Sequence, residues 1–473
     1  MYVLLGYGYR MAHQSLNDLP VLTDDFGLYT TFVEGIAEEI RQSQAPKTIA
    51  ITGYWGSGKT SVLAQLYAQL FGENPPSIKG EAVPTSNDAT PHYHGVWFEA
   101  WRYQHEPQPI IALMHTMRQS FSQKRQLFDK VGKIANVSMV AGLSVFDGVI
   151  KTLSAGAISG LDKIQSIGDK YEKDNLLSQL STDQINNALS TAIDHLLTNK
   201  VEIGEADRKC IIFIDDLDRC DATTAKKLLE GIKVHLNLEN CIFVIAIDPA
   251  QLEASFQLEH AQLRNTANKQ DISNHDATEY LEKLCQDAHR LPIASQQNIA
   301  DFVANNLNKI FRHEHDKYSD IIAAIKAELE QQNYLPANPR RLKMICNRLA
   351  AFITKTTNEE QNQLHAQSLL FLANTYVSYR EVYEMLSVCP DSINDLYKFA
   401  KSGKSDITAL KHLTALNGEA QGAFVHPNKI TEFRFASLLT EIEANGKLPA
   451  WGDYLHKLIQ SYNAPVPARI EAE

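Results

Sequence analysis

The segment Ile49–Leu63, I-A-I-T-G-Y-W-G-S-G-K-T-S-V-L, constrains the fold of this chain more than any other feature. It contains the complete pattern G-x-x-x-x-G-K-T, with a β-type run before the glycines and a helix-type run after them. Glycines let successive backbone N–H groups converge on phosphate oxygens, and the following helix directs its positive end at them. The lysine adds a charge and the threonine a hydroxyl ligand for Mg²⁺. The segment therefore predicts a nucleoside triphosphate site.

A second apolar run supplies the carboxylates that such a site needs. Residues Cys210–Cys220 read C-I-I-F-I-D-D-L-D-R-C, and the four apolar residues predict a strand buried on both faces of a parallel sheet. The strand ends in Asp215 and Asp216, at the edge where ligands bind in open α/β sheets. We expect Asp215 to hold Mg²⁺ through water and Asp216 to orient or deprotonate the attacking water.

A third buried strand, Cys241–Ile247, ends in Asp248-Pro249. A polar residue at the tip of the strand beside the metal-binding strand can sense the γ-phosphate, and the alternative is an Asp-Pro turn that only caps the strand. The predicted metal ligands are Thr60 and Asp215. The predicted nucleotide-binding residues are Gly53, Trp55, Gly56, Ser57, Gly58, Lys59, Thr60, Ser61 and Asp248.

Taken together, these motifs resemble the KAP family of P-loop NTPases. The resemblance runs in family order from about Leu19 to Leu349. One departure is Glu99, where the family usually shows Asn or Asp ahead of Ala-Trp; glutamate keeps an oxygen ligand but is longer and charged. The residues that carry the resemblance are Trp55 in the loop, F-E-A-W-R-Y at 98–103, the D-D-L-D-R-C box, the turn at Asp248, Tyr280–Lys283, Leu291-Pro292 and Asn338–Arg341.

The resemblance implies an α/β fold with an ASCE-type core, in which other strands of a parallel sheet separate the loop strand from the Asp-Asp strand. It also implies a C-terminal helical region like the lid of related ATPases. Arg340 or Arg341 looks like the lid arginine that reports on the γ-phosphate, and Arg219 looks placed to act across a subunit interface. The alternative for each arginine is an ordinary surface or helix-cap salt bridge. With Lys59 and Asp216, these arginines form the predicted catalytic set.

The pattern along the chain predicts a core interrupted by one insertion. The expected parts are the first part of the core at 15–125, a helical insertion at 126–204, the second part of the core at 205–294, a C-terminal helical domain at 295–463 and a disordered tail at 464–473. Within the C-terminal domain, helical periodicity is expected at Ile299–Phe311, Ser319–Gln331, Pro339–Thr354, Gln363–Leu386, Asp406–Leu416, Thr431–Ala444 and Trp451–Tyr462.

The insertion contains the apolar segment Ile134–Leu161, with Asp147 and Lys151 as its charged residues. Its longest uncharged run, Ile134–Phe146, is shorter than the roughly 20 residues that span a bilayer as a helix. The family resemblance points the other way, since many members carry membrane spans at this place. We expect a soluble helical element packed inside the protein or on another subunit, with membrane contact through 134–161 as the alternative.

Composition limits the partners and the compartment. The net charge of −11 argues against broad electrostatic binding to nucleic acid. The six cysteines show no C-x-x-C spacing, and Met1–Arg10 lacks the apolar core of an export signal, so we expect reduced thiols and a cytoplasmic location, with a peripheral membrane location as the alternative.

These observations predict an ATPase that uses ATP and Mg²⁺ and whose cycle drives a conformational or assembly change. The choice of ATP rests on the resemblance and on the lack of a guanine-recognition box; Asn17–Gly27 is the segment expected near the base. The resemblance also implies anti-phage defence, as a homo-oligomer or with other defence-system proteins. The alternative is a slow nucleotide-gated switch or scaffold that recruits effector partners.

Overall fold

The computed structural model describes residues 15–78, 93–128, 142–151, 154, 182–197, 208–235, 238–252, 285–356, 362–401 and 434–463. The chain divides into two compact units, which are described separately below. One consists of Pro20–Asp24 and Leu28–Pro292, and the other of Met1–Leu19, Asp25–Gly27 and Ile293–Glu473. The motif at 280–283, the predicted helix at 406–416 and the predicted tail at 464–473 lie outside the described residues.

The first unit is built on a parallel sheet with the strand order β2-β3-β4-β1-β5. Every residue of β3 and β4 is buried, which explains their continuous apolar runs. Because β4 lies between β1 and β3, the loop strand and the Asp-Asp strand are not neighbours, and the predicted core fold is confirmed. The strands are β1 (Lys47–Thr52), β2 (Tyr93–Glu99), β3 (Lys209–Asp215), β4 (Cys241–Ile247) and β5 (Asp287–Arg290).

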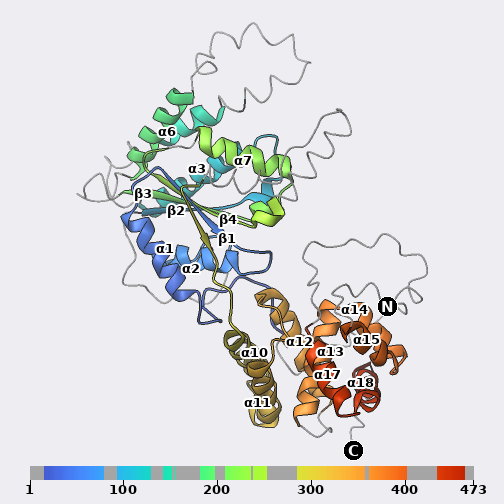
Figure 1. Ribbon diagram of the computed structural model, residues 1–473. Helices are drawn as coiled ribbons and strands as arrows, with labels where there is room; N and C mark the ends of the chain where they lie inside the picture. The colour runs from blue at the N-terminus through green and yellow to red at the C-terminus, as the bar shows by residue number, and fades with distance from the viewer. Residues whose placement is uncertain are drawn as a thin grey trace, which may run out of the picture. The chain divides into compact units, whose positions relative to one another are not determined.

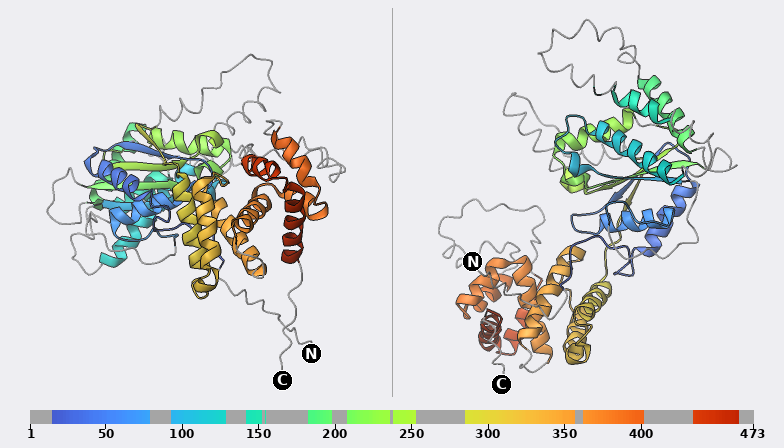
Figure 2. Two further views of the ribbon diagram at one scale, coloured as in Figure 1. Left: turned by 60° about the horizontal axis from the view of Figure 1, so that its bottom comes forward. Right: turned by 180° about the vertical axis from the view of Figure 1, so that it is seen from behind.

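Helices cover both faces of this sheet (Figures 1 and 2). On one face lie α1 (Thr30–Gln42) and α2 (Lys59–Phe71); on the other lie α3 (Pro109–Phe128), α6 (Thr182–Leu197) and α7 (Ala222–His235). Side chains alternate along β3, as a strand requires. The Phe213 ring lies 5.4 Å from that of Tyr67 in α2, whereas Ile212 and Ile214 join a core with Leu113 of α3.

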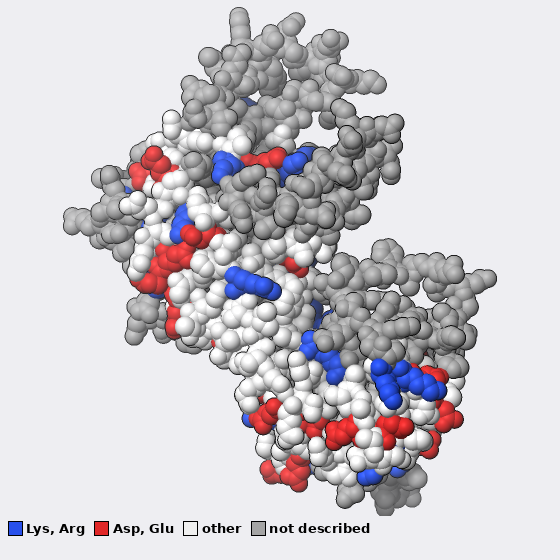
Figure 3. Space-filling view, viewed as in Figure 1, with Lys and Arg blue, Asp and Glu red and all other residues white. Residues whose placement is uncertain are grey.

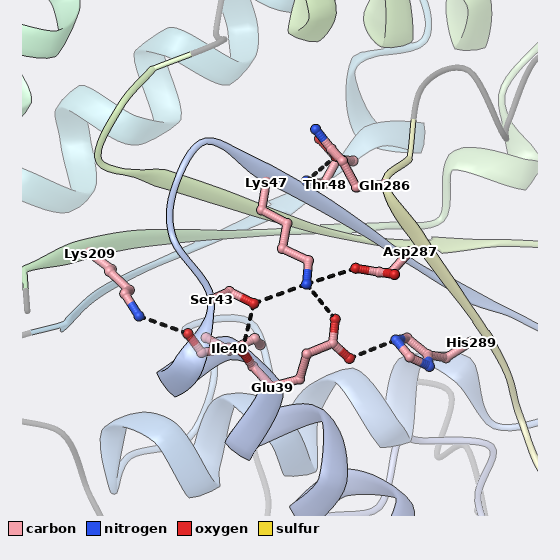
Figure 4. A network of polar contacts seen from close by, with 9 residues as sticks. All are labelled: Glu39, Ile40, Ser43, Lys47, Thr48, Lys209, Gln286, Asp287 and His289. Atoms are coloured by element: carbon pink, nitrogen blue, oxygen red, sulfur yellow. Dashed lines mark hydrogen bonds and ion pairs between the residues drawn. The ribbon is translucent and has the colours of Figure 1, made fainter.

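A polar network attaches α1 to the amino ends of the strands (Figure 4). Lys47 at the start of β1 contacts Glu39 of α1 and Asp287 of β5, each at 2.7 Å. The Lys47 ammonium holds the pKa of the Asp287 carboxyl below its usual value. On β3, the buried Lys209 donates hydrogen bonds to the carbonyls of Ile40 (2.9 Å) and of the residue after it (2.7 Å), and so satisfies the last turn of α1.

Two parts of the insertion are described, α6 and a helix at residues 142–151, which lies within the apolar segment Ile134–Leu161. The side chains of Leu143, Phe146, Val149 and Ile150 in the 142–151 helix are buried with those of α3 and α6, whereas Val145 is exposed. Asp147 forms a two-pronged ion pair with Arg118 of α3, with N–O distances of 2.6 and 2.9 Å. This part of the segment therefore turns one apolar face into the protein, and its acid is paired on the exposed side. Among the described residues, no helix is long and apolar enough to cross a membrane.

Two glycines in this helix give a matched test of its packing. A Cβ on Gly142 would lie 2.9 Å from the Leu196 side chain and 3.0 Å from the carbonyl oxygen of Ala192, whereas a Cβ on Gly148 meets nothing within 4 Å. We expect Gly142→Ala to lower the free energy of unfolding by about 1–3 kcal/mol through overpacking. Gly148→Ala should be neutral or stabilising by up to about 1 kcal/mol, since alanine favours a helix. Urea unfolding measures both, and equal effects would contradict the packing described.

The second unit is helical. Among the described residues, its helices are α10 (Gln296–Ile310), α11 (His315–Gln331), α12 (Pro339–Lys355), α13 (Gln363–Ser378), α14 (Arg380–Val388), α15 (Ser392–Lys401), α17 (Ala436–Ala444) and α18 (Leu448–Asn463). The expectation of one helix over Gln363–Leu386 is wrong. The chain breaks at the buried Tyr379, whose φ of −139° and ψ of 60° are not helical, so α13 and α14 are separate. The predicted Thr431–Ala444 helix begins later, at Ala436.

Residues from the start of the chain complete this unit. The Asn347 side chain of α12 accepts from the backbone N–H of Leu16 at 2.8 Å and donates to its carbonyl at 2.9 Å. Phe26 stacks on Phe302 of α10, with ring centroids 4.2 Å apart. A short segment far from α10 and α12 in sequence therefore supplies part of their packing.

Candidate nucleotide-binding site

The loop between β1 and α2 has the backbone shape that the motif predicts. Gly56 and Gly58 have φ values of 81° and 96°, in the region that favours glycine. A Cβ on Gly53 would lie 2.6 Å from the Ser57 Oγ, because the loop folds back on itself there. A side chain at position 56 or 58 would strain the backbone, and one at position 53 would require the Ser57 hydroxyl to move. The glycine spacing is a requirement of this turn.

The loop also carries features that fit an anion. Ser57 is buried, and among the described residues no partner is aligned with its Oγ. Tyr29, near the start of α1, donates its hydroxyl hydrogen to the Ser57 carbonyl at 3.0 Å and fixes that side of the loop. Helix α2 begins at Lys59, two residues after Ser57. The free backbone N–H groups and the positive end of the helix dipole therefore face the loop. An unsatisfied buried hydroxyl at a helix N-terminus suits a phosphate oxygen.

Lys59 is buried, and its ammonium has three oxygen neighbours. It donates to the carbonyls of Gly53 (2.9 Å) and Tyr54 (3.3 Å), and it lies 2.9 Å from the Asp218 Oδ2. Asp218 belongs to the 3₁₀ turn η4 (Leu217–Arg219), directly after β3. The sequence interpretation assigned no role to Asp218, although it is the third acid of the D-D-L-D-R-C box. Its position shows that this box contacts the loop lysine as well as the expected metal site.

Thr60 and Asp215 form the pair that fits a divalent cation. The Thr60 hydroxyl donates to the Asp215 Oδ1 at 3.2 Å, and Asp215 is almost completely buried. Burial, with smaller contributions from the nearby Asp216 and Asp218 charges, raises the pKa of Asp215 to about 7. Hydroxyl and carboxylate oxygens are the ligands that Mg²⁺ takes from proteins. A cation here would offset the repulsion among the acids, so the residues present fit Mg²⁺.

The raised pKa predicts how stability without metal depends on pH. The folded protein holds a proton on Asp215 more tightly than the unfolded chain does, so this contribution to stability is complete below about pH 4 and is lost as the pH rises to about 7. In EDTA, we expect the melting temperature of the wild type to fall relative to that of Asp215→Asn between about pH 5 and pH 8. Glu230→Gln, which removes an exposed acid of α7, should keep the wild-type profile. Parallel profiles for wild type and Asp215→Asn would show that Asp215 titrates normally.

Asp216 and Glu99 lie beside this pair, and each has a basic neighbour from its own segment. Asp216 has a φ of 56°, and its Oδ1 lies 3.0 Å from the Arg219 Nε. Glu99 is the register partner of Asp215 on the neighbouring strand and forms an ion pair with Arg102. Two carboxylates therefore lie near the predicted cation position, and Arg219, expected to act in another subunit, here contacts its own chain.

The sequence and the fold are similar to those of known proteins. A sequence model described as the KAP family P-loop domain matches residues 29–355, more than two thirds of the chain. The chain belongs to the KAP family. Among solved structures, the KAP chain is similar to the ORC2 protein of Aeropyrum pernix in its ADPNP–ADP complexes. The identity is 9% and the TM-score 0.35, over 95% of this chain and 98% of that one. No curated protein matches the sequence.

The remaining predicted contacts of the KAP domain have other partners. The Asp248 Oδ1 accepts from the Ala250 N–H at 3.1 Å, so the side chain caps the turn after β4. The Ser61 hydroxyl accepts from the Val21 N–H at 3.1 Å, so part of the segment expected near the base lies against α2. Trp55 is 39% exposed at the tip of the loop. Direct contacts of these side chains with nucleotide remain predictions.

The two lid arginines belong to the helical unit, at the start of α12. Asn338 caps this helix by accepting from the Arg341 N–H at 3.1 Å, and Pro339 occupies the first turn. The Arg340 Nε lies 2.7 Å from the Asp18 Oδ2, and burial lowers the pKa of Arg341. The N-P-R-R motif thus forms the N-terminal cap and first turn of α12. The γ-phosphate role of either arginine remains a prediction.

Proposed function

We propose that this KAP domain binds ATP with Mg²⁺ at the β1–α2 loop and hydrolyses it. The observation that carries the proposal is the hydrogen bond from Thr60 to Asp215, because it joins the loop to the acidic end of β3, 155 residues away. This is the arrangement that a metal-assisted phosphoryl transfer needs. The family assignment supports nucleotide binding and hydrolysis in general.

Within this proposal, each residue has a defined task. Lys59 and the loop N–H groups bind the β- and γ-phosphates, and Thr60 and Asp215 hold the cation, which offsets the phosphate charge when it is bound. Asp216 orients the attacking water or accepts its proton. Glu99, on the neighbouring strand, is the second candidate for that task. The choice of ATP rests on the family resemblance and on the lack of a guanine-recognition box, and the anti-phage setting rests on the resemblance alone.

A steady-state assay tests the proposal. Turnover above about 1 s⁻¹ with Mg²⁺ and ATP, absent in EDTA, supports an ATPase cycle that drives a conformational or assembly change. Turnover far below that value, with ATP still bound, favours the second function, a slow nucleotide-gated switch. Failure to bind ATP at all contradicts both.

The switch has one observation in its favour. Lys59 is paired with Asp218 and Asp216 with Arg219, and both contacts would have to change for these side chains to act on a triphosphate. A step of that kind favours slow turnover. The exposed charges on the face drawn in Figure 3 fall into small groups of both signs, and they do not favour one kind of partner.

We also propose nucleotide-dependent self-association, with Arg219 released from Asp216 to complete a neighbouring site. The Arg219 side chain is 37% exposed, so it is accessible for this role. Sedimentation with a non-hydrolysable ATP analogue should show assembly of the wild type and a weaker assembly of Arg219→Ala. A monomer under all conditions at tens of micromolar would contradict self-association and leave a complex with other proteins as the alternative.

A further inference from the structure

The Lys59–Asp218 pair is the feature of the site that the proposed function does not yet explain. Both side chains are buried, with exposed fractions of 9% and 5%. Each of the neighbouring acids has a separate partner, since Asp215 is bonded to Thr60 and Asp216 contacts Arg219. Asp218 is therefore the acid of the box that is directed at the phosphate-binding lysine.

The Lys59–Asp218 contact is an ion pair beside the two hydrogen bonds that the ammonium makes to the loop. The nitrogen–oxygen distance is 2.9 Å, but among the described residues no donor is aligned with the Asp218 Oδ2. The aligned hydrogen bonds of the ammonium go to the carbonyls of Gly53 and Tyr54. A phosphate that replaces the carboxylate can therefore leave both carbonyl contacts in place.

Electrostatics makes Asp218 a competitor of the nucleotide. A bound triphosphate brings its negative oxygens to the same ammonium, and two anions that share one buried cation repel each other strongly where water is scarce. Asp218 also gives the buried Lys59 a counter-ion while the loop is empty, and a buried cation without one is costly. The same carboxylate thus stabilises the empty loop and opposes the filled one.

We propose that Asp218 is a displaceable counter-ion that occupies Lys59 until the β- and γ-phosphates of ATP replace it. This positioning role rests on the proposed function. Because Asp218 lies in the three-residue turn η4 with Arg219, its displacement also reaches the arginine expected to contact a neighbouring subunit. Under this proposal, ATP binds less tightly than it would to the same loop without the Asp218 carboxylate. The carboxylate also makes the protein without nucleotide more stable.

The test compares Asp218→Asn with the wild type in the full chain. ATP affinity with Mg²⁺ is measured by calorimetry, and stability without nucleotide by thermal unfolding. We expect Asp218→Asn to bind ATP about 3–10-fold more tightly and to melt at a lower temperature without nucleotide. Opposite signs are the signature, because mere structural damage would lower both quantities. Glu230→Gln removes an exposed charge of α7 and should change neither.

A double-variant cycle shows whether the effect passes through the lysine. In a Lys59→Met background there is no lysine to compete for, so Asp218→Asn should raise ATP affinity by a smaller factor than it does in the wild type. Asp218→Ser provides the same comparison if the asparagine variant does not fold. Unchanged or weaker ATP binding by the neutral variants, while the wild type binds, overturns the counter-ion role alone. A wild type that does not bind ATP overturns the proposed function, and the counter-ion role with it.

Discussion

Replacing Lys59 with alanine should weaken ATP binding at least about 100-fold and abolish measurable turnover. The ammonium is buried at the α2 N-terminus, so its interaction with phosphate is little screened by water and is among the stronger charge-assisted contacts. A loss of this size corresponds to about 2.7 kcal/mol or more. Calorimetry measures the affinity, and a phosphate-release assay measures turnover.

Two controls separate a binding defect from a folding defect. Lys226→Ala removes an exposed lysine of α7 and should leave affinity unchanged. Lys59→Ala also leaves Asp218 buried without its cation, so the single variant should be destabilised. Adding Asp218→Asn should restore stability without restoring binding. Tight ATP binding by Lys59→Ala would remove the loop from the proposed site.

Asp216→Asn should retain ATP binding within about threefold and reduce turnover by about 100–1,000-fold. A positioned general base contributes a factor of this order, and asparagine keeps the shape while losing the charge. Single-turnover assays at saturating ATP separate the hydrolysis step from binding. Full activity would exclude Asp216 from catalysis, and Glu99→Gln is then the variant to measure, since Glu99 pairs in register with Asp215.

The core of the first unit could be predicted because its signals are local. The apolar runs of β3 and β4 match strands buried on both faces, and the glycines of the loop match a turn with positive φ. Strand β5 lacks such a signal. It has four residues, D-A-H-R, with alternating partial burial, and its pairing with β1 defines it as a strand.

The part of the site that could not be predicted depends on long-range contacts. Asp218 reaches Lys59 from 159 positions later in the chain, through a 3₁₀ turn that has no strong sequence signature. The charge of Arg219 would suit a contact with a neighbouring subunit equally well, and its contact with Asp216 depends on the backbone conformation of the folded turn. In the helical unit, helix-type periodicity continues across Tyr379, although the backbone there is not helical.

The way the chain is shared between the two units limits how the protein can be divided. The boundary between units is crossed after Leu19, Asp24, Gly27 and Pro292. A fragment that begins at Ile293 would lack Leu16, which bonds to Asn347, and Asp25 and Phe26, which contact α10. It would expose apolar surface that the intact chain covers. Cleavage at the 292–293 junction alone would leave the two products joined through the N-terminal segment, so truncation is a poor way to isolate either unit.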